Sequence, residues 1–233
     1  MCSKDKLEAR REPVAKSVEF FDAKNKTDRE KWVACEYLEN LGETFNEDEL
    51  VFSAEEPPDV LFRGANFEIK EILSEDRRRH QEYKKALQNT CVATAASELD
   101  ELIESKVITL AEISALIVKT AKELAEKKYP PDVRRNLDLL FYVNLTAVFD
   151  LVETPFPDCA ELQSLGYRSV AFIMHDQSVT LAANSDAPIF VRRSVGQICR
   201  RNIPVQTDFY SNGFFAECPF SVGLTTFLSN TDF

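Results

Sequence analysis

The most constraining feature of this sequence is a short stretch in which charged and apolar residues alternate on both sides of Gly64-Ala65. Alternation with a period of two is typical of a half-buried strand, because successive side chains point to opposite faces of a sheet. Two strands over 59–63 and 67–73, joined by a tight turn at Gly64-Ala65, are therefore predicted.

The predicted hairpin gathers two carboxylates and a lysine on one face. We expect a register in which Asp59 lies opposite Lys70, and Leu61 lies opposite Glu68. Asp59, Glu68 and Lys70 then share a face, because strand side chains alternate. A slip of one residue would reverse the two faces. The other face carries the apolar side chains that we expect in the core, with Phe62 opposite Phe67: Val60, Phe62, Phe67 and Ile69.

Two carboxylates beside a lysine suit metal-assisted hydrolysis of a phosphodiester. Asp59 and Glu68 offer the oxygen ligands that Mg²⁺ prefers, with Mn²⁺ as an alternative cation, and the main-chain carbonyl of Ile69 is a further candidate ligand. A bound cation lowers the pKa of water. Lys70 can orient that water or stabilise charge on the scissile phosphate. The alternative is a turn carboxylate at Asp59 that forms only a cross-strand salt bridge with Lys70.

A third carboxylate lies on a predicted helix over 28–41, which Thr27 or Asp28 can cap and which Gly42 ends. We expect Glu30 to face the edge of the sheet that holds Asp59, and to support the metal directly or through water. The alternative is a first-turn glutamate favoured by the helix dipole. Glu30 falls on the apolar stripe of this helix, which consists of Val33, Ala34, Tyr37, Leu38 and Leu41.

The remaining periodicity predicts an α/β protein with a mixed central sheet flanked by helices. We expect residues 1–17 to form a polar N-terminal segment, 18–200 to form the main domain, and 201–233 to form an irregular, Phe-rich tail. The helices over about 93–128 are expected to be an insertion, and the apolar stripe of 109–124 is either core or a dimer face. Further strands are expected at 50–54, 139–143, 168–174 and 178–183, and further helices at 75–90 and 195–201.

These motifs resemble the PD-(D/E)XK nuclease superfamily. The matching residues are Glu30, Pro58-Asp59 and Glu68-Ile69-Lys70, in the order expected of its α-β-β-β-α-β core. The resemblance implies a restriction-endonuclease-like fold and nuclease activity. More narrowly, the chain from about 18 to 196 looks like a bacterial family described only as an endonuclease of unknown function. The stretches that carry this narrower likeness are Arg29-Glu30-Lys31-Trp32-Val33, Glu56-Pro57-Pro58-Asp59-Val60-Leu61-Phe62-Arg63, Thr154-Pro155-Phe156-Pro157 and Asp186-Ala187-Pro188.

The charge of the chain bears on its partners. A net charge of −11 argues against loose, non-specific binding of nucleic acid, because phosphates repel an acidic surface. Nucleic acid is still the substrate class that the carboxylate–lysine group predicts. The alternatives are a catalytically inactive nuclease-fold module that binds a protein partner, a homodimer, and a nuclease inhibitor that mimics DNA. Basic residues at 77–80, 192–193 and 200–201 are candidates for phosphate contacts or for solvated surface.

The cysteines and the apolar runs indicate the compartment. None of the six cysteines forms a Cys-x-x-Cys pair, so we expect reduced thiols. No apolar run reaches the roughly 18 residues of a membrane span, and the charged N-terminus does not resemble a signal peptide. We therefore expect a cytoplasmic protein without a membrane partner.

Overall fold

A computed structural model describes residues 3–74, 79–94, 96–99 and 106–201 of the chain. The chain forms two compact units. The first unit takes in residues 1–29, 76–103 and 203–233, and the second takes in residues 30–75 and 104–202. The chain therefore passes back and forth between the units. The predicted tail over 201–233 lies outside the described residues, except for Arg201.

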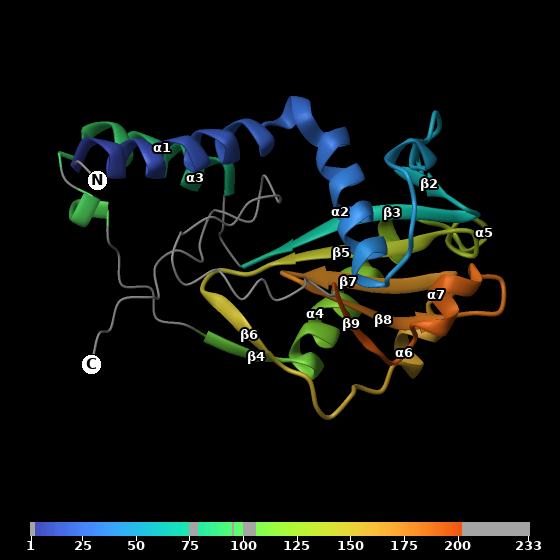
Figure 1. The fold of residues 1–233 in the computed structure, drawn as a ribbon. Helices are drawn as coiled ribbons and strands as arrows, with labels where there is room; N and C mark the ends of the chain where they lie inside the picture. Colours follow the sequence, from blue (N-terminus) through green and yellow to red (C-terminus); the bar gives the residue numbers. More distant parts are fainter. Residues whose placement is uncertain (1–2, 75–78, 95, 100–105, 202–233) are drawn as a thin grey trace. The chain divides into compact units, whose positions relative to one another are not determined.

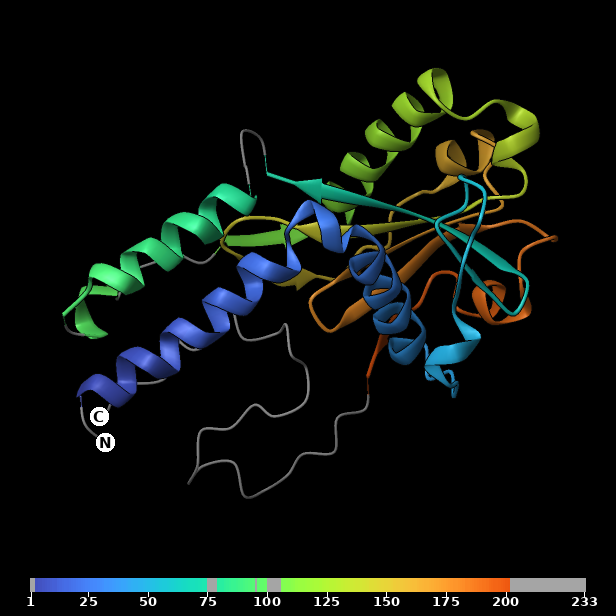
Figure 2. The same cartoon turned by 90° about the horizontal axis from the view of Figure 1, so that it is seen from above.

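The described part of the first unit is a pair of helices. Helix α1 (Ser3–Phe20) and helix α3 (Arg79–Val92) run side by side in both Figure 1 and Figure 2. The rings of Phe21 and Tyr83 stack with their centroids 5.0 Å apart, and Arg11 donates a hydrogen bond of 3.1 Å to the carbonyl of Thr90. Two short 3₁₀ turns, η1 (Ala23–Asn25) and η3 (Ala96–Leu99), complete these residues.

The second unit is built on a seven-stranded mixed sheet within the described residues, which confirms the predicted α/β class with a central mixed sheet flanked by helices. Strands β1, β2 and β3 form an antiparallel meander, β3, β5 and β7 are parallel, and β8 and β9 return antiparallel. The strands in spatial order are β1 (Val51–Phe52), β2 (Val60–Phe62), β3 (Ala65–Leu73), β5 (Asp138–Asn144), β7 (Ser169–Met174), β8 (Gln177–Ala183) and β9 (Ile198–Arg200). A separate parallel pair joins β4 (Lys106–Thr109) to β6 (Val148–Val152).

Two helices cover opposite faces of the sheet, as Figure 2 shows. Helix α2 (Lys26–Asn40) packs Val33, Ala34, Tyr37 and Leu38 onto Phe67, Ile69 and Leu140. Helix α4 (Leu110–Lys127) packs onto the alternate residues of the same strands, including Ile72, Leu139 and Phe141. We call these the α2 face and the α4 face. The shorter elements are η2 (Glu47–Glu49), α5 (Pro131–Arg134), α6 (Ala160–Ser164) and α7 (Ile189–Arg193).

Helix α4 belongs to the core of the second unit. It begins with a capping box, in which Thr109 Oγ1 accepts from the Glu112 N–H and Glu112 Oε2 accepts from the Thr109 N–H. We expected 109–128 to be part of an insertion, but its apolar stripe is fully buried against the sheet. The buried residues are Leu110, Ile113, Ile117 and Ala121. None of the described helices combines the length and apolar character of a membrane span.

One expected element at the end of the sheet has the wrong type. Residues 195–201 were expected to be helical, but Ile198–Arg200 pair with β8 as the edge strand β9. Tertiary pairing here overrides local preference. The helix lies just before it, as α7. At the beginning of the expected helical insertion, residues 96–99 form the 3₁₀ turn η3, while 95 and 100–105 lie outside the described residues.

The hairpin between β2 and β3 is tighter than expected. Arg63 and Gly64 form a two-residue loop, both with positive φ values of 41° and 82°, which is the combination that a type I′ turn requires. Phe62 therefore pairs with Ala65, and the register is shifted by two residues from the expected one. Because the shift is even, every side chain keeps the face that the alternation predicted.

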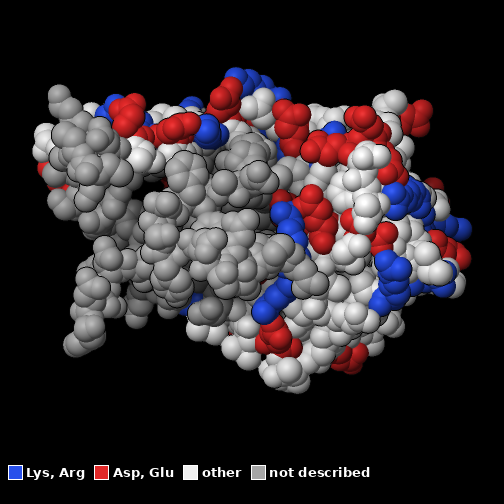
Figure 3. Space-filling view, in the orientation of Figure 1, with Lys and Arg blue, Asp and Glu red and all other residues white. Residues whose placement is uncertain are grey.

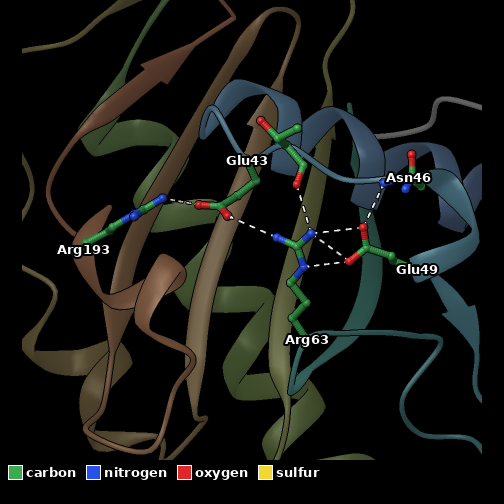
Figure 4. Close-up of polar contacts among 6 residues, drawn as sticks. Glu43, Asn46, Glu49, Arg63 and Arg193 are labelled. Atoms are coloured by element: carbon green, nitrogen blue, oxygen red, sulfur yellow. Dashed lines mark hydrogen bonds and ion pairs between the residues drawn. The ribbon is translucent and has the colours of Figure 1, made fainter.

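The tip of the hairpin is held by the Arg63 guanidinium (Figure 4). Arg63 Nε donates to Glu49 Oε2 at 2.8 Å, while Nη2 donates to Glu49 Oε1 and to the Thr44 carbonyl, each at 3.0 Å. The Glu43 carboxylate lies between Arg63, at 3.8 Å, and Arg193, with which it forms a close ion pair. These contacts join the hairpin tip to the segment 43–49 and to the end of α7.

The beginnings of the three parallel strands are joined by hydrogen bonds to Asp138, whose exposure is only 1%. Asp138 Oδ1 accepts from Arg168 Nε at 3.0 Å and from Ser169 Oγ at 2.7 Å. Its Oδ2 accepts from the backbone N–H of Asn66 at 2.8 Å and also pairs closely with Arg168. One carboxylate thus connects the beginnings of β3, β5 and β7.

Replacing this carboxylate should destabilise the sheet. Asp138→Ala leaves the Arg168 guanidinium without its buried partner, so we expect the free energy of unfolding to fall by about 3–5 kcal/mol. Urea denaturation followed by circular dichroism measures this change. Asp176→Ala, at the exposed turn between β7 and β8, is the control and should change the value by less than about 0.5 kcal/mol. Equal losses in the two variants would contradict this role of Asp138.

Candidate functional site

Asp59, Glu68 and Lys70 come together on the α4 face, as the alternation predicts. Asp59 immediately precedes β2, and its N–H donates at 2.9 Å to the carbonyl of Phe67, the residue of β3 that pairs with Val60. This register sets Asp59 beside Glu68 rather than opposite Lys70, which corrects the expected pairing. Both carboxylates are buried, with side-chain exposures of 2% each.

The Lys70 ammonium lies at the centre of the group. Its Nζ donates to the Ile69 carbonyl at 2.8 Å, forms a close hydrogen bond with Glu68 Oε1, and lies 3.7 Å from Asp59 Oδ2. Asp59 Oδ2 is held from the other side by the Ile69 N–H, which donates to it at 2.8 Å. Three oxygens from three residues thus surround one positive charge.

Two further residues, which no sequence pattern indicated, reach Glu68 from the C-terminal end of α4. The buried Tyr129 hydroxyl donates a close hydrogen bond to Glu68 Oε1, and Lys128 Nζ lies 3.4 Å from the same oxygen. They are about 60 residues away from Glu68 along the chain. Only the packing of α4 over β3 brings them there, so no local spacing could have identified them.

The charges of the group hold Glu68 ionised. Burial acts to raise the pKa of the Glu68 carboxyl, but the hydrogen bond and charge of Lys70, the Tyr129 hydrogen bond and the Lys128 charge together bring that pKa below its ordinary value. For the Tyr129 hydroxyl, burial and the contact with Glu68 both raise the pKa. Glu68 is therefore a carboxylate, and Tyr129 is a neutral donor to it.

One oxygen of Glu68 is not used by these contacts. Glu68 Oε2 is buried and finds no hydrogen-bond partner among the described residues. A buried carboxylate oxygen without a donor costs free energy, so such atoms deserve an explanation. It belongs to the same carboxylate as the Oε1 that contacts Lys70, so it is a further oxygen that a cation at this site could use.

Glu30 is not brought to this group, which corrects the expectation from the helix stripe. It is half-buried on α2, and α2 covers the α2 face, whereas Glu68 and Lys70 lie on the α4 face. Among the described residues, no group of three or more His, Cys, Asp or Glu side chains is arranged to hold a metal ion. The stripe correctly identified the buried side of the helix, but it could not indicate which face of the sheet the helix covers.

Three of the four arginines at 192–193 and 200–201 suggested as phosphate contacts pair with carboxylates, and the fourth, Arg192, donates to the Ala187 carbonyl at 2.9 Å. Arg193 pairs with Glu43, Arg200 with Glu153, and Arg201 with Glu36 at 3.2 Å. On the side of the molecule that Figure 3 shows, the described basic and acidic side chains are interspersed. These arginines therefore fit the interpretation as solvated surface. The side chains of 77–80 lie outside the described part of the chain.

Comparison with known proteins gives two matches of different kinds. The sequence model of a family described as "Putative endonuclease, protein of unknown function (DUF1780)" matches residues 3–207. A solved structure of a protein of unknown function from Pseudomonas aeruginosa strain PAO1, PA4535, described under "Monooxygenase Superfamily", is 28% identical with a TM-score of 0.61. That similarity covers 86% of this chain and 96% of that chain. Among curated proteins, none matches.

The lowered pKa of Glu68 predicts a pH-dependent stability. A carboxyl whose pKa is lower in the folded chain stabilises the fold above its ordinary value of 4.5, and this contribution is lost as the pH falls through the folded value. Glu68→Gln should therefore lower the free energy of unfolding at neutral pH, and the difference from wild type should shrink below about pH 4.

Urea denaturation in EDTA at several pH values measures this difference without interference from metal ions. Glu55→Gln, in an exposed segment, serves as the control and should match wild type to within about 0.5 kcal/mol. A difference between wild type and Glu68→Gln that stays constant with pH would show that the ionised carboxylate is not stabilised in the folded chain.

Proposed function

The chain belongs to the DUF1780 family, and on this premise we propose that it is a metal-dependent endonuclease that hydrolyses phosphodiester bonds of nucleic acid with Mg²⁺ or Mn²⁺. The observation that carries the proposal is the convergence of Asp59 Oδ2, Glu68 Oε1 and the Ile69 carbonyl on the Lys70 ammonium. Two carboxylates, a carbonyl and a lysine in one small volume are the groups that such hydrolysis uses.

The order of the elements supports a restriction-endonuclease-like core. From α2 to β5 the second unit runs α2, β1, β2, β3, α4 and β5, leaving aside the segment that belongs to the first unit and the short elements η2, β4 and α5. This is the α-β-β-β-α-β order expected of the PD-(D/E)XK superfamily. The proposed site residues lie immediately before β2 and in the middle of β3, in the order of the motif.

The donor set fits a divalent cation. Carboxylate and carbonyl oxygens are the hard ligands that Mg²⁺ and Mn²⁺ take, with water and phosphate oxygens completing the coordination. The Lys70 ammonium already occupies the position of a positive charge among three of these oxygens, and Glu68 Oε2 adds an unpartnered fourth. When bound, the cation would neutralise charge on the phosphate and lower the pKa of a bound water.

Each residue of the chain then has a distinct role. Asp59 and Glu68 hold the cation, with Asp59 oriented by the Ile69 N–H and Glu68 oriented by the Tyr129 hydroxyl. With a cation held by the two carboxylates, Lys70 would be the group that donates a hydrogen bond to the attacking water or to a phosphate oxygen. Because both carboxylates are buried, bulk water screens these interactions less than it would at an exposed site.

The two matches point to different chemistry, and the site favours the family's description. The monooxygenase description belongs to the P. aeruginosa protein. The residue types gathered here, two buried carboxylates with a lysine and a tyrosine, suit the binding of a hard cation and the positioning of water. We therefore base the proposed function on hydrolysis.

Loss of the central residues should abolish cleavage. We expect Asp59→Ala and Lys70→Ala to reduce Mg²⁺-dependent cleavage of DNA or RNA by at least about 100-fold, because they remove a metal ligand and the group that positions the nucleophile. Glu30→Ala is the matched control on the α2 face and should retain most of the activity. Gel analysis of labelled substrates measures this, and equal cleavage by wild type, Asp59→Ala and Lys70→Ala would refute the proposal.

Substitution of Lys70 should increase the affinity for a metal ion although it abolishes cleavage. Lys70→Met keeps the apolar stem but removes the ammonium that competes with a cation for Asp59 and Glu68. We expect Mn²⁺ to bind this variant roughly tenfold or more tightly than wild type, while cleavage is lost. Calorimetric titration measures the affinity, and Asp59→Ala should show none at this site. Unchanged or weaker Mn²⁺ binding by Lys70→Met would contradict competition between the ammonium and the cation.

A further inference from the structure

A second lysine lies beside the proposed metal ligands, and its exposure differs from that of Lys70. The backbone of Lys128 is fixed at the end of α4, where its N–H donates to the Leu124 carbonyl at 2.9 Å. Its Nζ lies 3.4 Å from Glu68 Oε1. The Lys128 side chain is 52% exposed, against 22% for Lys70. Lys128 therefore approaches the same carboxylate from the solvent side.

The direction of the Lys128 side chain is set by Tyr129. The ammonium lies 4.8 Å from the centroid of the Tyr129 ring, within the range of a cation–π contact, and the hydroxyl of that ring is bonded to Glu68. The Nζ of the neighbouring Lys127 instead lies 3.5 Å from Glu123 Oε2, one turn earlier on the same helix. Of this adjacent pair, Lys128 is the lysine that lies at the site.

The charges of the site indicate what Lys128 could bind. Asp59 and Glu68 are balanced by Lys70 and Lys128 in the structure. A divalent cation held by the two carboxylates would take over that balance, so both ammonium groups would lose their partners and the site would carry a local positive charge. The chain as a whole has a net charge of −11, so such a local field is what an approaching phosphate requires.

We propose that Lys128 binds a backbone phosphate of the nucleic-acid substrate next to the scissile one. This inference rests on the proposed function and adds a substrate contact to it. Lys70 is mostly buried, so it can contact the reacting groups. Lys128 is half-exposed, so it can contact the phosphate backbone of the nucleic acid at the protein surface. A phosphate contact positions the polymer without reading its sequence, so Lys128 contributes affinity rather than base preference.

The test compares Lys128→Met with Lys127→Met, which removes the same charge from the same end of α4. Binding of a labelled DNA duplex and of the RNA duplex of the same sequence is measured in Ca²⁺ over a range of salt concentrations. We expect Lys128→Met to weaken binding about tenfold and to reduce the slope of log affinity against log salt by about 1. Lys127→Met should stay close to wild type in both respects.

Kinetics and metal binding separate a substrate contact from a structural counter-charge. Lys128→Met should raise KM for the cleaved duplex about tenfold while kcat stays within about threefold of wild type, as expected when uniform binding is lost. Equal weakening by the two variants would overturn the inference, because only net charge would then matter. An effect of Lys128→Met confined to Mn²⁺ affinity would also overturn it.

The outcomes distinguish this inference from the proposed function. A wild-type protein that binds Mn²⁺ and cleaves, together with a Lys128→Met variant that binds and cleaves equally well, would overturn the role of Lys128 alone. A wild-type protein that neither binds Mn²⁺ nor cleaves either duplex would overturn the proposed function, and the substrate contact with it.

Discussion

A buried carboxylate must be compensated, and the centre of the second unit is organised around that requirement at Glu68. With a side-chain exposure of 2%, Glu68 stays ionised only because lysine and tyrosine donors surround it. These donors come from β3 itself and from the end of α4, so satisfying one charge also fixes the helix to the sheet. The same contacts that stabilise the fold therefore assemble the candidate site.

The role of Lys70 follows from this requirement. Without a cation, two carboxylates in one small buried volume would repel each other, and Lys70 Nζ lies between them. Lys70 thus stabilises the two carboxylates when no cation is bound, and it is also the residue that the proposed reaction would use. Breaking a buried ion pair by removing one partner is costly, so a single side chain links folding and the proposed activity.

The sequence predicted which side chains share a face of the sheet, but it did not predict the strand register or the contacts between distant segments. Alternation placed Asp59 with Glu68 and Lys70, and an even register shift left that result intact, although the two-residue turn at Arg63-Gly64 changed the pairing. Helical periodicity found the buried side of α2 but not the sheet face that it covers, so Glu30 was placed wrongly. Tyr129 is separated from Glu68 by a long excursion of the chain, and contacts over such distances depend on tertiary packing, which periodicity does not encode.

The interleaving of the two units has a consequence for synthesis on the ribosome. Helix α1 is made before β1, β2 and β3, whereas its partner α3 follows only after them. The parallel partner of β3 in turn comes after α3 and α4. Neither unit can be completed before a large part of the other has appeared, and such non-local pairing slows folding. Nascent chains should thus expose an unpaired edge of β3. Chaperones that bind extended apolar segments would be expected to bind this edge.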